Sequence, residues 1–272
     1  MNPTLALLLL GLLIALSVTV ARRTPRTDRD WASDHAVPAR ITFENGRVRI
    51  ENLRDFGYET PQVFTESYRD EAYLLEDVLR VWLVLAPFAK GWRGLAHSFL
   101  SFELTEGRFV AISAEARREA DETYSLIGGL LRRFEVTYVV ATEDDLIGLR
   151  ALRGDRLFLY PTRASPQQAR ALFEDMLSRA ERLRTRPEFY HTLFNNCTTN
   201  LLEHVRGITS ERLPYGWGVL LPGYSDRLAL ARGALDTDLS IGEARRHFRV
   251  DARAREARGA SGSFGRQLRE GL

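Results

Sequence analysis

The sequence predicts an α+β domain that follows an N-terminal apolar segment, and three patterns lead to this fold class. Short runs with apolar and polar residues in alternation, within 41–50 and 97–115, are typical of β-strands. Over residues 165–184, apolar residues recur at helical spacing behind a capping signal. Residues 4–21 carry no charge and are long enough to span a bilayer.

The N-terminal segment has two interpretations. Residues 4–21, TLALLLLGLLIALSVTVA, resemble both a membrane span and a secretory signal segment with a weak cleavage site at Thr19-Val20-Ala21. We therefore interpret residues 1–21 as a transmembrane anchor or a signal segment. Four arginines follow the run and no basic residue precedes it. The positive-inside rule alone would place the domain behind it in the cytoplasm.

Composition sets the remaining boundaries. Residues 22–30 form a basic linker, which spans roughly 30 Å when fully extended. We expect the domain to cover residues 31–250. Residues 251–272 are rich in Ala, Arg, Gly and Ser, so they predict a weakly ordered basic tail. The net charge of +2 gives no reason to expect nucleic acid as a partner.

Turn and capping residues predict where the helices and strands of the domain begin and end. Asn45-Gly46 predicts the turn of one hairpin, and Gly107 predicts the turn of a second between 97–104 and 109–115. Residues 71–87 contain apolar runs that fit either a helix or strands. We expect a helix over 125–133, a strand over 134–141, a short helix over 143–152 capped by Thr142, and a strand over 156–160 that ends at Pro161.

Two further helices carry clear end signals. Ser165 as N-cap, Pro166 at the first helical position and Gln168 form a capping box for the helix over 165–184. A second helix is predicted to begin near Thr198 and to end at Gly207. The turn residues at 221–224 favour a packing turn over a loop that lines a substrate groove.

The chain has a single cysteine, which excludes an intramolecular disulfide and a cysteine-rich zinc site. Cys197 lies within Asn195-Asn196-Cys197-Thr198-Thr199-Asn200, and these capping residues place it at a helix N-terminus. The helix dipole and free N–H groups there favour a thiolate. We assign Asn196 and Thr198 to the helix cap and to an oxyanion site. The alternative is a buried, unreactive cysteine.

Among the five histidines, His97 is the best candidate base for this thiol. His204 lies two helical turns beyond Cys197, roughly 10.5 Å along the axis, which is too far for a hydrogen bond. His191 remains an alternative. His97 begins the strand over 97–104. From the residues alone, a structural cysteine and a strand histidine explain the pattern equally well.

The third member of a triad depends on strand register. If Glu103 pairs with Phe109, Glu115 lies opposite His97 and orients its imidazole. Ser113 and Glu103 are the other candidates for this role, and Glu115 fits a surface ion pair with Arg117 or Arg118 equally well. We find no set of residues at metal-ligand spacing and expect no metal or other cofactor.

Six stretches together resemble one family, the Lnb-type periplasmic domain of bacterial membrane proteins. They are RDFGY at 54–58, AHSFLSFE at 96–103, ISAEARRE at 112–119, LFLYP at 157–161, NNCTTN at 195–200 and LPGYSD at 221–226. The likeness covers about Trp31 to Val250. Many relatives are longer and have several membrane spans, whereas this sequence has one apolar run.

The resemblance implies a circularly permuted papain-like, NlpC-type thiol fold with Cys197 as nucleophile and His97 as base. It also implies N-acylation of bacterial lipoproteins, in which an acyl chain passes from a membrane phospholipid to the cysteine as a thioester and then to a lipoprotein amine. The implied location is the bacterial inner membrane, with a single span and the catalytic domain in the periplasm. We prefer this location to the one that the arginines predict, because the orientation rule is statistical.

Two other functions remain open. The first is a thiol hydrolase, either a phospholipase or a cell-wall peptide amidase, and the second is an inactive binding module of the cell envelope. A lipid enzyme should have an apolar route to Cys197, whereas a cell-wall enzyme should have a polar open groove. The apolar residues Trp82, Phe88, Trp92, Trp217, Leu220 and Leu221 favour lipid slightly, although each also fits core packing.

Overall fold

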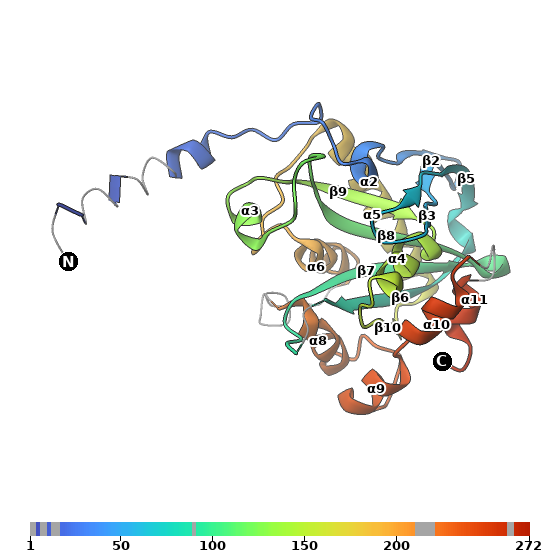
Figure 1. Cartoon of the computed structure of the whole chain (residues 1–272). Helices are drawn as coiled ribbons and strands as arrows, with labels where there is room; N and C mark the ends of the chain where they lie inside the picture. The colour runs from blue at the N-terminus through green and yellow to red at the C-terminus, as the bar shows by residue number, and fades with distance from the viewer. Residues whose placement is uncertain (1–3, 6–9, 12–16, 89–90, 210–220, 260–263) are drawn as a thin grey trace.

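The computed structural model describes residues 4–5, 10–11, 17–88, 91–209, 221–259 and 264–272 (Figure 1). Most of the apolar run over 4–21, and with it the predicted anchor or signal segment, lies outside the described residues, as do Trp217 and Leu220. In the part of the chain that is described, no helix combines the length and the apolar character needed to cross a membrane.

The architecture is α+β and is built on one mainly antiparallel sheet of eight strands. The strand order is β1-β2-β9-β8-β7-β6-β10, with β5 also paired to β2. The strands are β1 Arg40–Glu44, β2 Arg47–Arg54, β5 Tyr68–Leu74, β6 Val78–Pro87, β7 Ala96–Leu104, β8 Arg108–Arg117, β9 Glu135–Ala141 and β10 Phe158–Pro161. A separate small sheet pairs β3 Gly57–Tyr58 with β4 Phe64–Thr65. The ambiguous residues 71–87 are therefore mostly strand.

Helices cover both faces of the large sheet (Figure 1). They are α2 Ser33–Ala36, α3 Leu126–Leu130, α4 Leu149–Leu152, α5 Pro166–Thr185, α6 Cys197–Ile208, α8 Ser225–Ala231, α9 Ile241–His247, α10 Asp251–Ala257 and α11 Phe264–Arg269. A π-helical turn, η3 Asp144–Gly148, leads into α4, and 3₁₀ turns occur at η1 Leu75–Asp77, η2 Thr105–Gly107 and η4 Pro222–Tyr224.

Both predicted hairpins are confirmed, and their turns have the predicted chemistry. Asn45 and Gly46 join β1 to β2 with φ of 49° and 75°, a left-handed pair that suits the twist of the strands. Glu106 and Gly107, with φ of 62° and 68°, turn the chain from β7 into β8. The pairing of Glu103 with Phe109 also matches the predicted register.

The core has two main layers because neighbouring residues of the central strands point to opposite faces. Phe102 of β7 faces α5, where its ring lies 4.9 Å from that of Phe173. Phe99 of the same strand belongs to the opposite layer, with Ile147 of η3 and Leu268 of α11. These side chains are fully buried, so β7 is held from both sides.

The ends of α5 and α6 follow their capping residues. Ser165 and Gln168 form the predicted capping box of α5. Helix α6 has Asn196 as N-cap and begins at Cys197, one residue before the predicted start. It continues through Gly207, its predicted end, to Ile208.

The prediction of a weakly ordered tail over 251–272 is wrong for its described residues, 251–259 and 264–272. They form α10 and α11, and Ala254, Ala257, Phe264 and Leu268 belong to the same buried cluster as Ile147 of η3 and Ala151 of α4. Composition alone suggested disorder, but helical spacing gathers the small and apolar residues of the segment on one side. The guanidinium of Arg253 ties the two helices together by donating to the carbonyl oxygen of Leu268 at 2.9 Å.

The basic linker over 22–30 lies along the domain and does not form a free tether. The guanidinium of Arg23 donates to the carbonyl oxygen of Leu131 at 3.0 Å. Arg29 pairs with Glu119 at 2.7 Å and with Glu135 at 2.8 Å. The chain that leaves the N-terminal segment is therefore held beside α3 and β9.

Candidate active site

The candidate site lies where the central sheet opens between β7 and β8. Pairing between these two strands stops at Leu100 and Ile112. Beyond that point β7 stays paired with β6 as far as Ala96, and β8 stays paired with β9 as far as Arg117. Figure 1 shows the two strand pairs diverging, with α6 beside the opening. A pocket of about 450 Å³ occupies this region.

Cys197 is the first residue of α6 and faces this pocket with 6% of its surface exposed. The Asn196 side-chain oxygen accepts from the N–H groups of Thr198 at 2.9 Å and Thr199 at 3.0 Å. In return, the Thr199 hydroxyl accepts from the Asn196 N–H at 2.7 Å. The reciprocal cap holds the helix start, and with it the thiol, in one position.

The cap changes one part of the predicted site. The N–H groups of Thr198 and Thr199 already donate to Asn196, so they are not available to an oxyanion. Asn196 therefore has the predicted cap role, whereas Thr198 is a residue whose N–H is capped, and its backbone amide does not fit the predicted oxyanion role. The Thr198 hydroxyl lies 3.7 Å from the Cys197 sulfur and 3.0 Å from the Ser98 hydroxyl, where it helps to fix the thiol.

His97 is linked to Glu115 through Ser113. The Nε2 atom of His97 lies 2.6 Å from the Ser113 hydroxyl, which donates to Glu115 at 2.9 Å. The direct distance from Nε2 to the Glu115 carboxylate is 3.6 Å. The predicted register is present, but the strands separate before reaching His97 and Glu115, so a serine fills the extra space. With Nε2 donating to Ser113, Nδ1 is the ring nitrogen that can accept a proton.

The electrostatics of the pocket favour a thiolate. Burial raises the pKa of the Cys197 thiol, but this effect is outweighed by the charge and hydrogen bond of His97, together with the Ser98 backbone N–H and the Thr198 side chain. The net result lowers the pKa from 9.0 to about 7. A thiol with this pKa is half ionised near neutral pH, as a nucleophile requires.

Glu115 supports the histidine as a charged group. Burial opposes its ionisation, but Arg150 at 3.0 Å, His35 at 3.6 Å and His97 together hold the pKa of this carboxyl well below its usual range. Glu115 is therefore a carboxylate at neutral pH. It contacts Arg150 rather than Arg117 or Arg118, the partners expected if it were a surface charge.

Two tyrosines that were not predicted as site residues also line the pocket. The Tyr124 and Tyr190 hydroxyls are 3.3 Å apart, and both residues border the pocket that contains Cys197. Burial raises the pKa of each phenol, and the nearby Cys197 thiolate raises both further. Both phenols therefore stay protonated and can donate a hydrogen bond beside the sulfur. No local motif marked them, because they come from the loops that flank α3 and α6.

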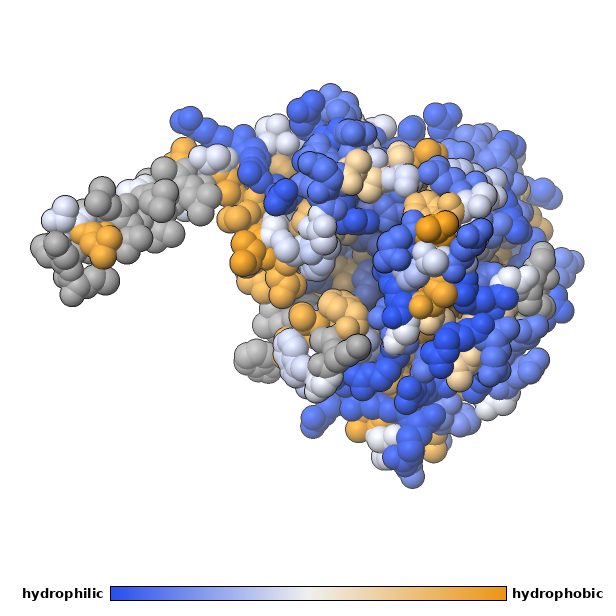
Figure 2. Space-filling model, in the orientation of Figure 1, coloured by the Kyte–Doolittle hydropathy of each residue, from blue (hydrophilic) through white to orange (hydrophobic). Residues whose placement is uncertain are grey.

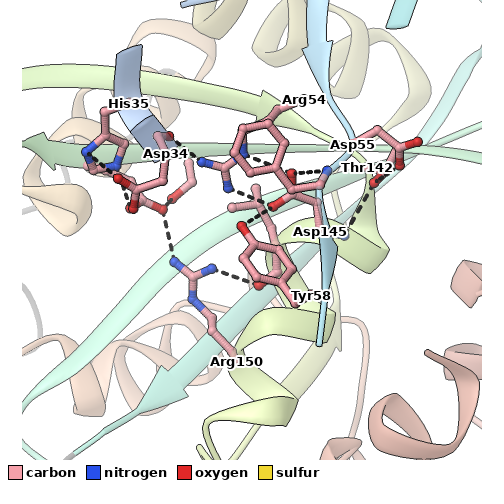
Figure 3. Close-up of polar contacts among 12 residues, drawn as sticks. Asp34, His35, Arg54, Asp55, Tyr58, Thr142, Asp145 and Arg150 are labelled. Carbon is pink, nitrogen blue, oxygen red and sulfur yellow. Dashed lines mark hydrogen bonds and ion pairs between the residues drawn. The ribbon is translucent and has the colours of Figure 1, made fainter. Parts of the chain in front are cut away.

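A buried ion pair supports the pocket wall, as Figure 3 shows. Arg54 of β2 makes two bonds to the Asp145 carboxylate, at 2.9 and 2.7 Å. The same carboxylate accepts from the Phe56 N–H at 3.0 Å and the Tyr58 hydroxyl at 3.2 Å. Arg54 also donates to the carbonyl oxygen of Asp34 at 2.6 Å. This network fixes α2, which carries His35, against the start of η3.

The pocket lining combines apolar side chains with charged ones and is rich in arginine. Arg54, Arg118, Arg150 and Arg153 line it, together with three carboxylates. Arg118 pairs with Asp34 at 2.8 Å, whereas Arg153 makes no ion pair within the described part of the chain. Burial lowers the pKa of Arg153, but an arginine remains charged at neutral pH. The rim therefore offers a cation to an anionic group of a ligand.

The turn over 221–224 packs against the loop that leads into β7. The Arg93 guanidinium donates to the carbonyl oxygen of Gly223 at 2.8 Å, and the Gly223 N–H donates to Gly94 at 3.2 Å. A Cβ atom at Gly223 would lie 1.5 Å from the backbone oxygen of Arg93, so only glycine fits there. The segment is a packing turn that positions the start of the His97 strand.

The other candidates lie away from the thiol. His204 lies on α6 with Tyr138 and Asp175, each 2.6 Å from one of its ring nitrogens. Nδ1 of His191 accepts from two backbone N–H groups of its own turn. Glu103 accepts from the Trp82 indole at 2.9 Å and pairs with Phe109 near the turn between β7 and β8. Among the described residues, no group of three or more His, Cys, Asp or Glu side chains is placed to hold a metal ion.

A comparison with protein families identifies the domain. Residues 64–223 match the model of the Lnb N-terminal periplasmic domain, and this range contains both His97 and Cys197. The match covers more than half of the 272 residues and confirms the resemblance found in the sequence. No curated protein and no solved structure matches the chain.

Proposed function

Because the chain belongs to the Lnb N-terminal periplasmic domain family, we propose that it is a thiol acyltransferase acting at the bacterial inner membrane. The observation that carries this proposal is a buried thiol with a pKa of about 7, held beside a histidine in a pocket. A structural cysteine has no need of a lowered pKa, and burial by itself would have raised it.

In the first half of the proposed reaction, the Cys197 thiolate attacks the ester carbonyl of a phospholipid. A C–S bond forms as the ester C–O bond breaks, and the protonated His97 gives its proton to the departing alkoxide. The products are a thioester on Cys197 and a lysophospholipid. The hydroxyls of Tyr124 and Tyr190 are our candidates to hold the oxyanion of the tetrahedral intermediate, since the α6 cap occupies two amides.

In the second half, the α-amino group of a lipoprotein attacks the thioester. A C–N bond forms, the C–S bond breaks, and the neutral His97 takes a proton from the incoming amine. This step regenerates the thiolate and the imidazolium. Glu115, acting through Ser113, orients the ring and stabilises its charged form during both halves. No cofactor takes part in either half.

Two features support a phospholipid as the acyl donor. Arg153 lies at the pocket rim, where a guanidinium suits a phosphodiester headgroup. Phe88, which is 48% exposed, lines the same pocket at the end of β6 and offers apolar surface to an acyl chain.

We also propose that the fold is a circularly permuted form of the papain-like, NlpC-type architecture. The strand that carries His97 precedes the helix that begins at Cys197, which is the order of the permuted arrangement. We further propose that the segment over 1–21 is the single membrane span and that the domain faces the periplasm. The periplasmic setting of the family supports this orientation.

Intact-mass spectrometry after incubation with mixed phospholipids tests the proposal. We expect a fatty-acyl adduct on the wild-type protein that hydroxylamine removes and that is absent from Cys197→Ser. His97→Ala should acquire the adduct much more slowly. An unmodified protein with unconsumed lipid would contradict the proposal and favour a peptide amidase or an inactive binding module. Release of free fatty acid in the presence of an acceptor amine would identify a phospholipase instead.

A further inference from the structure

Helix α3 buries its small residues and exposes its large apolar ones, which is the reverse of an ordinary surface helix. Its sequence is LIGGL, and Gly128 and Gly129 are buried while Leu126, Ile127 and Leu130 are 41%, 69% and 41% exposed. A Cβ atom at Gly129 would lie 2.3 Å from the Thr192 hydroxyl, so the small residues allow close packing on the domain. The large apolar side chains consequently point away from the core.

A neighbouring loop extends this surface. Leu193 and Phe194 are 38% and 66% exposed, and the Thr192 hydroxyl joins their loop to α3 by donating to Leu126 at 2.7 Å. The same loop leads directly into the Asn196 cap, whose side-chain amide donates to the carbonyl oxygen of Thr192 at 2.7 Å. Exposed apolar side chains thus gather immediately before the Cys197 helix.

We propose that this surface, formed by Leu126, Ile127, Leu130, Leu193 and Phe194, docks on a phospholipid bilayer and presents the Cys197 pocket to it. We call it the docking face. Figure 2 shows hydrophobic surface gathered over α3, next to the place where the N-terminal segment joins the domain. An exposed apolar cluster of this kind is typical of an interaction site.

The position of the N-terminal segment identifies the occupant as a bilayer. Its last described residues, Val20 and Ala21, border one groove together with Leu130 and Phe194. Arg23 follows two residues later and donates to Leu131 O at 3.0 Å, so the end of the apolar segment is fixed beside α3. A segment that enters the membrane from this point brings the docking face to the lipid surface.

The charges around the docking face suit anionic headgroups. Arg22, Arg23 and Arg132 are exposed, and among the described residues none of them pairs with a carboxylate. Glu188 borders the same groove, but it is bound by Arg179 through two 2.6 Å contacts. Apolar side chains flanked by arginines that have no carboxylate partner are typical of surfaces that bind membranes.

The docking face also connects to the pocket. Tyr124 is 37% exposed, lines the pocket and lies one residue before Ser125, the N-cap of α3. An acyl chain rising from a docked bilayer would therefore meet Tyr124 before reaching the thiol. This inference rests on the proposed lipid donor, but the docking itself can be measured without catalysis.

Site-specific labelling of the full chain in nanodiscs of phosphatidylethanolamine and phosphatidylglycerol tests the docking face. A Cys197→Ser background removes the native thiol, and a bimane label is placed at Ile127→Cys or Phe194→Cys. The control is Leu79→Cys, since Leu79 is 42% exposed at the opposite end of β6 from Pro87. We expect lipids brominated on the acyl chain to quench the first two labels and not the control, and aqueous iodide to quench them several-fold less than the control.

Three outcomes overturn the docking face. Iodide quenching equal to that of the Leu79 label would mean that the surface faces water. Protection from iodide without quenching by brominated lipid would mean that protein, such as a second copy of the chain, covers it. Equal quenching of the control by brominated lipid would mean that contact with lipid is not confined to this face.

Acylation rates with two different donors distinguish a loss of docking from a loss of the chemical step. In otherwise wild-type protein, Ile127→Asp with Phe194→Asp should lower acylation from nanodisc lipid several-fold and leave acylation by a short-chain soluble ester unchanged. Loss with both donors would contradict a docking role for these residues. If neither donor acylates the wild-type protein while the labels still enter the bilayer, the proposed chemistry fails and the docking face stands.

Discussion

Removing the His97 imidazole gives the most direct test of the candidate site. In the folded protein, burial raises the pKa of Cys197, and the charge and hydrogen bond of His97 are the largest effects that lower it to about 7. His97→Ala removes these two effects and keeps the burial. We therefore expect the thiol pKa of the variant to rise to 9 or above, close to or beyond the ordinary value of 9.0.

The expected change in reactivity has two opposing parts. At pH 7 a thiol of pKa 7 is half ionised and one of pKa 9 about 1% ionised, so the thiolate population falls about 50-fold. A more basic thiolate is intrinsically more nucleophilic, and with a Brønsted slope of about 0.45 two pKa units restore about 8-fold. The net loss of alkylation rate at pH 7 is therefore roughly 6-fold, and the position of the midpoint is the more decisive quantity.

The assay is the rate of modification of Cys197 by iodoacetamide between pH 5 and 11, followed by intact mass. Because the chain has one cysteine, the adduct that is absent from a Cys197→Ser control reports on this thiol. For wild type, the rate should rise with a midpoint near pH 7 and level off above pH 8. For His97→Ala, the rate should stay low at neutral pH and continue to rise above pH 9.

His191→Ala is the matched control, because His191 was the alternative base and lies six residues before the thiol. Its Nδ1 already accepts from backbone N–H groups, so its loss should leave the midpoint near pH 7. A midpoint that moves with His191→Ala and not with His97→Ala would refute the assignment of the base. A wild-type midpoint near pH 9 would refute the thiolate argument as a whole.

Three further changes probe the support around the thiol. Glu115→Gln should lower the acyl-transfer rate roughly 10- to 100-fold, because it weakens the orientation of the His97 ring. Cys197 should stay open to alkylation, because the thiol itself is unchanged. Tyr190→Phe should lower kcat about 100-fold with an unchanged alkylation midpoint if its hydroxyl stabilises the oxyanion; an unchanged kcat removes it from that role. Asp145→Ala leaves the Arg54 guanidinium buried without its partner and should cost about 3–5 kcal/mol in urea unfolding, against less than about 1 kcal/mol for the exposed Arg49→Ala.

The parts of the fold that the sequence predicted are those with local signals. Asn45-Gly46 and Gly107 fix their turns through backbone conformations that few other residues adopt. Ser165 and Asn196 fix helix starts because a side-chain oxygen meets amides two or three residues ahead. The position of Cys197 at the start of α6 follows from such a signal, within one residue.

The parts that were not predicted depend on contacts between distant segments. The link through Ser113 exists because β7 and β8 separate beyond Leu100 and Ile112, and no residue in the hairpin signals that separation. Arg150 reaches Glu115 from α4, whose placement on the sheet is a matter of packing. The ordered tail is a similar case, since the burial of Phe264 depends on a surface formed by other elements.

The separation of β7 and β8 explains how one pocket meets two opposing needs of a thiol enzyme. A dry pocket strengthens the interaction between a thiolate and an imidazolium, but it also favours the neutral thiol. Where the pairing with β8 has ended, the His97 Nε2 atom lies 2.6 Å from the Ser113 hydroxyl and 3.6 Å from the Glu115 carboxylate. The open sheet allows Glu115, which Arg150 keeps ionised, to stabilise the imidazolium from one side while Cys197 lies on the other. The lowered thiol pKa thus depends on His97, whose ring is held at the open end of the sheet by Ser113 and Glu115.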